Sequence, residues 1–248
     1  MNLFWLALSF LTTLPAKQIP YIPDGLGKSS PFFPLIGLII GCVVLFVASL
    51  SSLVLPTSLA AIFALLTWIL LTGGLHLDGL ADCCDGLFGS VSAEKRLEIL
   101  KDPRSGSFAV IGLIIALALK GALIFVILDG PVQSLNWLPF LLAPTIARFL
   151  ILPTAIQPQA RPQGMGADFS ATISRKIIGL ASILPIVLIL AGWQQPINLV
   201  AGAVFAAIGT AIWIFLARSR IGGVTGDVYG AVVETAEISI LLGFALIV

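Results

Sequence analysis

The sequence has 248 residues, of which 58% are hydrophobic and only 10% are charged, and its mean hydropathy is +1.10. A soluble domain carries about 25% charged residues, so this composition excludes an ordinary soluble protein and indicates one that lies in lipid. The net charge of +1 gives no electrostatic basis for binding nucleic acid, and we expect no such partner. Three cysteines without a CxxC spacing predict free thiols rather than a zinc site.

Helices are predicted along the whole chain. An apolar stretch from Leu3 to Leu14 is too short to cross a membrane and predicts a buried or interfacial helix. A span needs about 20 apolar residues. Runs of that length predict seven spans, at about 32–54, 58–75, 107–128 and 137–154, two within 177–217 that are divided at 192–196, and one at 230–248. We therefore predict an all-α, polytopic membrane bundle that forms a single domain over residues 1–248.

The basic residues alternate between the predicted connections. The connections near 51–57, 129–136 and 192–196 contain no Lys or Arg. Basic residues fill the other connections: Lys17, Lys28, Lys95, Arg96, Lys101, Arg104, Arg161, Arg175, Lys176, Arg218 and Arg220. Because basic loops stay in the cytoplasm, this pattern predicts that the long loops 76–106 and 155–176 are cytoplasmic, and it supports the count of seven spans.

A first carboxylate cluster lies in the segment Gly73–Ser90, directly after a predicted span. Asp78, Asp82 and Asp85 follow the spacing i, i+4, i+7, which places all three within an arc of about 60° on a helix. Like charges on one face repel each other, so we expect a cation beside them. Carboxylate oxygens suit Mg²⁺, Mn²⁺ or Ca²⁺, and Mg²⁺ in particular combines few carboxylates with substrate phosphates. The cluster therefore predicts a metal site for phosphoryl chemistry.

An ordinary solvated helix end is the alternative interpretation of this cluster. Its acids would be balanced by the basic residues Lys95, Arg96 and Arg104. Carboxylates beside a span are costly and usually functional, which favours the metal site. His76 lies off the acidic face, and we expect it to cap the helix or support the site as a substrate-binding residue rather than to bind the metal.

A second polar segment, Arg220–Leu242, leads into the last predicted span. Its three acids are Asp227, Glu234 and Glu237. The glycines of this segment allow a ligand to approach the backbone closely, and a Gly-rich turn before a helix N-terminus suits phosphate. We take Gly223, Thr225, Gly226, Glu234 and Glu237 as candidate substrate-binding residues. The alternative is a loop with helix-capping acids, which the position of two glutamates in an apolar run disfavours.

Two cations fall inside predicted spans and therefore need a partner or a polar cavity. Lys120 lies deep in its span and is expected either to pair with a carboxylate or to contact substrate. Arg148 lies nearer the cytoplasmic end and can reach an acid cluster or a phosphate. Two cytoplasmic residues, Arg104 and Arg161, are further candidates to hold a phosphate.

These segments together resemble the cobalamin synthase family, membrane enzymes that act as adenosylcobinamide-GDP ribazoletransferases. The resemblance extends over nearly the whole chain in six blocks that occur in order. The blocks are FLTTLP (10–15), HLDGLADCCDG (76–86), KDPRSGSFAVIG with the following lysine (101–120), APTIAR (143–148), ARPQGMG (160–166) and IGGVTGDVYGAVVETAE (221–237).

The resemblance implies a magnesium-dependent transferase in a late step of vitamin B12 assembly. Adenosylcobinamide-GDP would be joined to alpha-ribazole, or to its 5′-phosphate, and GMP would be released. The family's setting implies the bacterial plasma membrane, with the active site facing the cytoplasm, and leaves oligomerisation open.

Roles for the candidate residues follow from that reaction. Mg²⁺ would be held by Asp78, Asp82 and Asp85 and would bridge the diphosphate. The proton of the acceptor hydroxyl would be taken by either Asp85 or Asp227. The charge on the transferring phosphoryl group would be neutralised by arginine; the candidates are Arg104, Arg148 and Arg161.

Three rival functions fit the sequence less well than the synthase. A non-catalytic membrane scaffold would leave the clustered carboxylates without a purpose. A CDP-alcohol phosphatidyltransferase uses a similar acid motif, but its usual arginine position is occupied by Cys84 and no D-x3-D follows Gly86. A secondary transporter would use the intramembrane charges as an ion path. The sequence contains no repeat of the kind common in transporters, and most of its charges lie at one predicted membrane face.

Overall fold

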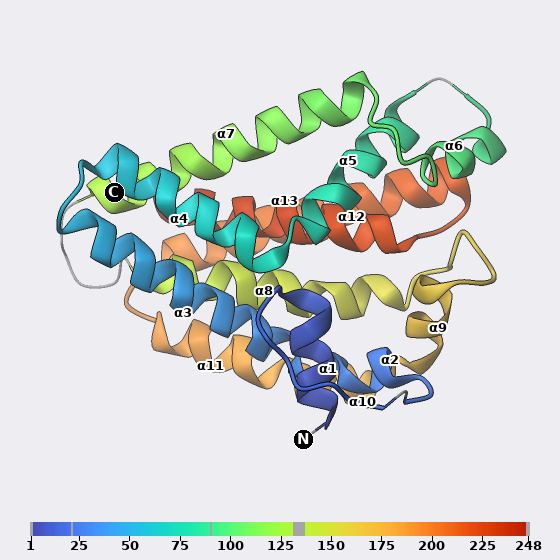
Figure 1. Cartoon of the computed structure of the whole chain (residues 1–248), viewed down its shortest axis with the longest axis horizontal. Coiled ribbons are helices and arrows are strands. Elements are labelled where there is room, and N and C mark those ends of the chain that lie inside the picture. Colours follow the sequence, from blue (N-terminus) through green and yellow to red (C-terminus); the bar gives the residue numbers. More distant parts are fainter. Residues whose placement is uncertain (1, 21, 90, 131–136, 247–248) are drawn as a thin grey trace.

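The computed structural model describes residues 2–20, 22–89, 91–130 and 137–246, and these residues fold almost entirely into helices (Figure 1). The elements in chain order are α1 (Asn2–Leu11), α2 (Gly25–Ser29), the 3₁₀ turn η1 (Ser30–Phe32), α3 (Phe33–Ser52), α4 (Thr57–Thr72), α5 (Leu75–Phe88), α6 (Ala93–Ile99), α7 (Ser107–Asp129), α8 (Leu138–Ala155), α9 (Met165–Thr172), α10 (Arg175–Ala181), α11 (Ile183–Ala191), α12 (Pro196–Ile221) and α13 (Gly226–Ala245). The all-α class and the short N-terminal helix are confirmed.

The described residues contain five helical segments that are long and apolar enough to cross a membrane. These segments are Gly25–Ser52, α7, α8, α12 and α13. Two bent pairs, α4 with α5 at 88° and α9 with α10–α11 at 90°, raise the number to seven if each pair counts as one span. This agrees with the seven predicted spans. Residues 131–136 of the connection predicted at 129–136 lie outside the described residues. Residues 247–248, at the end of the last predicted span, also lie outside them.

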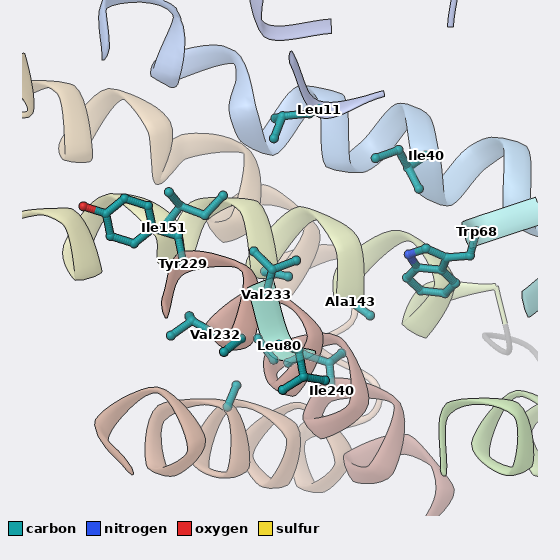
Figure 2. Packing of buried hydrophobic residues seen from close by; sticks show 14 of the residues in the cluster. Leu11, Ile40, Trp68, Leu80, Ala143, Ile151, Tyr229, Val232, Val233 and Ile240 are labelled. Atoms are coloured by element: carbon teal, nitrogen blue, oxygen red, sulfur yellow. The ribbon is translucent and has the colours of Figure 1, made fainter. Parts of the chain in front are cut away.

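Helix α13 forms the centre of the bundle. It packs against α12, α5, α8 and α7, and nearly all of its side chains are buried. Figure 2 shows Val232, Val233 and Ile240 of α13 among buried residues that include Leu80 of α5 and Ala143 of α8. The outer faces of α4, α7, α11 and α12 instead expose large apolar side chains, as a lipid-facing surface requires.

The bend between α4 and α5 is made by two glycines. Gly73 and Gly74 have φ values of 59° and 73°, a left-handed conformation that glycine adopts without strain. Thr13 covers the end of α4, because its hydroxyl donates to the carbonyl of Leu70 (2.8 Å) and its amide donates to that of Leu71 (2.8 Å). The segment after α1 is thereby attached to the bend, and α5 leaves it in a new direction.

The polar connections gather at one end of the bundle. Figure 1 shows α6, α9 and the turn between α12 and α13 at the right of the view, opposite the connection between α3 and α4. Helix α13 begins at Gly226, four residues before the predicted start of the last span, so Asp227 belongs to its first turn. The polar residues of α5, α9 and α13 can therefore meet at this end.

Candidate active site

A cavity of about 330 Å³ opens between α5, α9 and α13 at the polar end of the bundle. Its polar wall includes residues that the sequence singled out: His76, Asp78, Arg161, Thr225, Gly226 and Asp227. The rest of the wall is mostly apolar and is contributed by Phe10, Leu26, Phe33, Leu75, Ile151, Phe169, Val224 and Tyr229. The cavity therefore places charged and apolar groups face to face in a space of small-molecule size.

Close packing of two glycines brings the ends of α5 and α13 together. A Cβ atom at Gly79 would lie 2.8 Å from the carbonyl oxygen of Asp227, and one at Gly230 would lie 3.0 Å from that of His76. Neither position has room for a side chain, so the two backbones touch where the helices cross. This contact explains why Asp78 and Asp227, which are far apart in the sequence, line one cavity.

A short backbone bridge positions Arg161. The amide of Val224 donates to the carbonyl of Pro158 (2.8 Å), and the amide of Ala160 donates to the carbonyl of Val224 (2.9 Å). A side chain at Gly223 would collide with this segment. Gly223 therefore allows the bridge rather than lining the cavity, and the bridge holds Arg161 beside the first turn of α13.

The Arg161 guanidinium is only partly used by the protein. Its Nη2 donates to the carbonyl of Leu97 (3.1 Å), whereas its buried Nε has no hydrogen-bond partner among the described residues. A buried donor without a partner is costly. Arg161 also lines the cavity, so it stays a candidate to bind an anionic ligand there.

Three helices begin at the cavity wall. The wall includes Leu75 at the start of α5, Gly166 in the first turn of α9, and Gly226 at the start of α13. The first amides of a helix lack intrahelical acceptors and carry partial positive charge. Helix N-termini are suited to bind phosphate oxygens, so the phosphate site expected at the Gly-rich turn before α13 stays a prediction that this placement allows.

Carboxylates form the other polar part of the site. Asp78 and Asp227 line the cavity, and the hydroxyl of Thr225 donates to the Asp227 carboxylate (3.1 Å). The charges of Asp78, Asp227 and Asp85, and that of Arg161, all act on Asp82, which is half-buried. Several negatively charged side chains therefore lie near one another at the polar end of the bundle.

The donor set fits a magnesium ion that binds together with a diphosphate. Within the described ranges, no three His, Cys, Asp or Glu side chains are close enough to hold a metal ion by themselves. Mg²⁺ typically takes one or two protein carboxylates and completes its shell with water and substrate phosphates. Asp78 and Asp227 supply two carboxylates on the cavity wall.

Asp85 has different partners from the other two acids of its motif. Its carboxylate accepts hydrogen bonds from the amides of Gly106 (2.5 Å) and Ala109 (2.9 Å), which are at the start of α7. Asp85 therefore caps that helix from outside, and it is absent from the cavity wall. These contacts do not support the metal-binding and catalytic roles predicted for Asp85. Both roles stay predictions.

The intramembrane charges form a separate, buried network. Lys120 of α7 pairs with Glu234 (3.0 Å) and with Glu237, both on α13, and Arg148 of α8 also pairs with Glu237. Trp68 of α4 donates its indole N–H to Glu237 (3.1 Å), and its ring lies 4.5 Å from the Lys120 ammonium. None of these side chains is more than 4% exposed.

The charges of this network are paired within it, although the buried Nε of Arg148 has no hydrogen-bond partner among the described residues. None of its members lines the cavity. The substrate-binding role predicted for Lys120, Glu234 and Glu237, and the catalytic role predicted for Arg148, therefore find no support in the contacts. The contacts of Lys120 instead match the alternative expectation, which was that this residue pairs with a carboxylate. His76 joins the two regions, because it lines the cavity and its Nδ1 lies 3.5 Å from an Arg148 nitrogen.

Arg104 lies outside the cavity wall. Its guanidinium is exposed and holds Asp102 through Nε (2.9 Å) and Nη2 (2.6 Å). These hydrogen bonds lower the pKa of the Asp102 carboxyl to about 2. Arg104 is thus engaged in a local pair on the loop before α7, and the predicted phosphate contact stays a prediction.

The sequence did not point to the aromatic part of the cavity. Phe10, Phe33, Phe169 and Tyr229 all line it, together with Gln159, whose Oε1 accepts a hydrogen bond from the Tyr229 hydroxyl (3.2 Å). The three phenylalanines lie in apolar surroundings and resemble ordinary core residues. Only the recurrence of Gly and Gln around 157–166 could have drawn attention to that loop.

Comparison with known proteins agrees with this geometry. Residues 3–245 match the model of a family described as cobalamin-5-phosphate synthase. The relatives include proteins named adenosylcobinamide-GDP ribazoletransferase from Pseudomonas putida (strain W619), which is 37% identical over 98% of both chains, and from Pseudomonas syringae pv. syringae (strain B728a), which is 39% identical over 98% of this chain and 99% of the relative. No solved structure matches the chain. The chain belongs to the cobalamin-5-phosphate synthase family, as its sequence motifs indicated.

Proposed function

We propose that the protein transfers the phosphocobinamide group of adenosylcobinamide-GDP to ribazole and releases GMP. The observation that carries this proposal is the convergence of three helix N-termini, Arg161 and two carboxylates on one cavity. Such a site favours a diphosphate and a metal ion together. The names of the relatives, which cover nearly the whole chain, supply the identity of the two substrates.

The reaction is a displacement at the phosphorus that carries the cobinamide group. A ribose hydroxyl oxygen of the acceptor forms a bond to this phosphorus, and the bond from the phosphorus to the bridging oxygen of GMP breaks. Asp227, which lines the cavity, would take the hydroxyl proton as a general base. Arg161 and the helix N-termini stabilise the negative charge on the phosphoryl oxygens.

Magnesium, when bound, would supply positive charge that shields the diphosphate and stabilises the leaving GMP. Asp78 would hold it on the protein side, with Asp82 close by, which leaves Asp227 free to act as the general base. The proposed set differs from the one expected from the sequence because it leaves out Asp85, whose carboxylate caps α7. Whether the acceptor is free ribazole or its 5′-phosphate is decided by whether the cavity tolerates a second anionic group.

We further propose that the cavity faces the cytoplasm of a bacterial cell and that the bundle lies in the plasma membrane. The basic connections occur at the end of the bundle that holds the cavity, and basic loops remain cytoplasmic. A cytoplasmic mouth also gives access to a GDP-bearing substrate. The relatives are bacterial proteins.

The test is release of GMP by the purified protein in detergent or lipid. The reaction contains adenosylcobinamide-GDP, ribazole and Mg²⁺, and controls omit the acceptor or chelate the metal. Asp227→Asn is expected to lower the rate at least about 100-fold. The matched control is Asp129→Asn, because Asp129 is exposed at the C-terminal end of α7 and does not line the cavity.

Acceptor-dependent release that requires both Mg²⁺ and Asp227 is the expected result. Release without ribazole would identify a hydrolase instead. A folded wild type without any release would remove the proposal and return the CDP-lipid enzyme and the transporter to consideration. The buried network argues against a transporter, because Lys120, Glu234 and Glu237 are already paired with one another.

A further inference from the structure

His76 connects the buried ion network with the cavity. It lies in the first turn of α5, it lines the cavity, and it is 3% exposed. On the side of the network, its Nδ1 lies 3.5 Å from Nη2 of Arg148. Arg148 is itself held in place, because its Nη1 donates to Glu237 in a fully buried pair between α8 and α13. The packing of the bundle therefore sets the position of the cation that meets the imidazole.

This contact decides which imidazole nitrogen carries the hydrogen. A guanidinium nitrogen donates hydrogen bonds and never accepts them, so Nδ1 of His76 must be the acceptor. An imidazole that accepts at Nδ1 carries its hydrogen on Nε2. The two ring nitrogens thus have different tasks. Nδ1 receives a hydrogen bond from Arg148, and Nε2 is left as a hydrogen-bond donor.

The Nε2 atom of His76 has no hydrogen-bond partner within the part of the chain that the structure describes. It also differs from the fully enclosed side-chain atoms that lack a partner in that part, which are Thr145 Oγ1, Arg148 Nε, Arg161 Nε and Thr210 Oγ1. An unpaired atom that is not enclosed reaches accessible space, and the space that His76 lines is the cavity. The Nε2–H group is therefore available to a ligand there.

The surroundings of His76 indicate which ligand atom this group meets. A nitrogen that already carries its hydrogen takes no proton from a hydroxyl, so His76 is not the general base. It can donate to an oxygen instead, and hydrogen bonds to charged oxygens are the stronger ones. Arg161 and the first residues of α5, α9 and α13 line the same cavity. Arginine and helix N-termini are groups that stabilise phosphoryl oxygens.

We infer that His76 is a catalytic residue that donates its Nε2–H to a phosphoryl oxygen of adenosylcobinamide-GDP, and that Arg148 is the positioning residue that fixes its tautomer. The inference rests on the proposed function. The hydrogen bond transfers no proton; it becomes stronger as negative charge collects on the phosphoryl oxygens in the transition state. The ion network then also serves the reaction, since Glu237 holds Arg148 and Arg148 holds His76.

Nitrogen NMR tests the tautomer directly, because the sequence contains one histidine. Protein with ¹⁵N-labelled histidine, purified in detergent through a tag without histidine, gives signals from the His76 ring alone. We expect a hydrogen on Nε2 and none on Nδ1. Addition of adenosylcobinamide-GDP with Mg²⁺, in the absence of ribazole, should shift the Nε2 signal. A hydrogen on Nδ1, or an Nε2 signal that ignores the added substrate, overturns the inference.

Two substitutions separate catalysis from support of the network, and each is the control for the other. In His76→Asn the side-chain oxygen can replace Nδ1 as the acceptor for Arg148, but no donor extends to the place of Nε2. In His76→Gln the longer amide can place an N–H there, but the acceptor for Arg148 is lost. The kcat of His76→Asn should fall about 10- to 100-fold at an unchanged unfolding temperature. His76→Gln should unfold at a lower temperature and yet keep at least about ten times the kcat of His76→Asn.

A purely structural His76 gives the opposite order. Activity would then follow stability, with His76→Asn active and His76→Gln impaired, and this result overturns the inference, as does an equal kcat in the two folded variants. If neither variant folds, the NMR titration of the wild type decides. Failure of the proposed function looks different, because the wild type would then release no GMP, whatever the tautomer of His76.

Discussion

At the scale of single residues, equal spacing along a helix does not mean equal surroundings. Asp78, Asp82 and Asp85 share one angular face of α5, but a helix rises 1.5 Å per residue, so the first and last are about 10 Å apart along the axis. Asp78 reaches the cavity, whereas Asp85 reaches the start of α7. Periodicity fixes the direction of a side chain but not its partner.

Asp85→Ala is expected to reduce stability more than activity. The change removes two hydrogen bonds to the start of α7, and loss of such a cap costs about 0.5–2 kcal/mol. GMP release should stay within a few-fold of the wild type, while the temperature of unfolding, followed by tryptophan fluorescence, should fall. A loss of activity as large as that of Asp227→Asn, in a stable protein, would instead assign Asp85 to the metal site.

Arg161→Lys should weaken binding of the donor although the charge is kept. Lysine lacks the planar fork with which arginine binds phosphate oxygens, and the Arg161 Nε is a donor without a partner in the described structure. We expect the KM for adenosylcobinamide-GDP to rise about tenfold. The control is Arg175→Lys, since Arg175 is exposed at the start of α10; equal effects of the two changes would contradict a specific role.

At the scale of elements, the sequence predicts the helices well and their crossings poorly. Hydropathy marks each span because lipid contact demands long apolar runs. The last predicted span begins at residue 230, four residues after the first residue of α13, because Gly226 and Asp227 interrupt the apolar run although both are helical. The close approach at Gly79 and Gly230 depends on two distant segments, and a single sequence does not reveal it.

Gly79→Ala should separate α5 from α13 and damage the site. The added methyl group would lie 2.8 Å from the carbonyl oxygen of Asp227, and such overpacking costs about 1–3 kcal/mol. Both the unfolding temperature and GMP release should decrease. Gly179→Ala is the matched control, because no atom lies within 4 Å of that added group and alanine favours the helix. Full activity of Gly79→Ala would contradict the assigned crossing.

At the scale of the whole molecule, one ion network connects four helices. The charges of Lys120 on α7, Arg148 on α8, and Glu234 and Glu237 on α13 balance one another, and Trp68 adds α4. The sequence identified these charges as needing partners but did not pair them, since more than a hundred positions separate Lys120 from either glutamate. Long-range pairing follows from the packing of the whole bundle.

Glu237→Gln should therefore destabilise the whole bundle. It removes one of two negative charges that face two buried cations, and breaking a buried ion pair costs about 3–5 kcal/mol. The unfolding temperature in detergent should fall by many degrees. Glu98→Gln, in the exposed pair with Lys95, should hardly change it. A similar small effect for both would show that the buried network contributes nothing to stability.

The central position of α13 also affects how the protein is made. Helices α5, α7 and α8 are synthesised before α13, so during membrane insertion Lys120 and Arg148 enter the bilayer without their negative partners. A buried cation in lipid costs several kcal/mol. The nascent bundle therefore stays incomplete until α13 is inserted. The two glutamates of α13 then neutralise the buried cations, and its first turn completes the cavity wall.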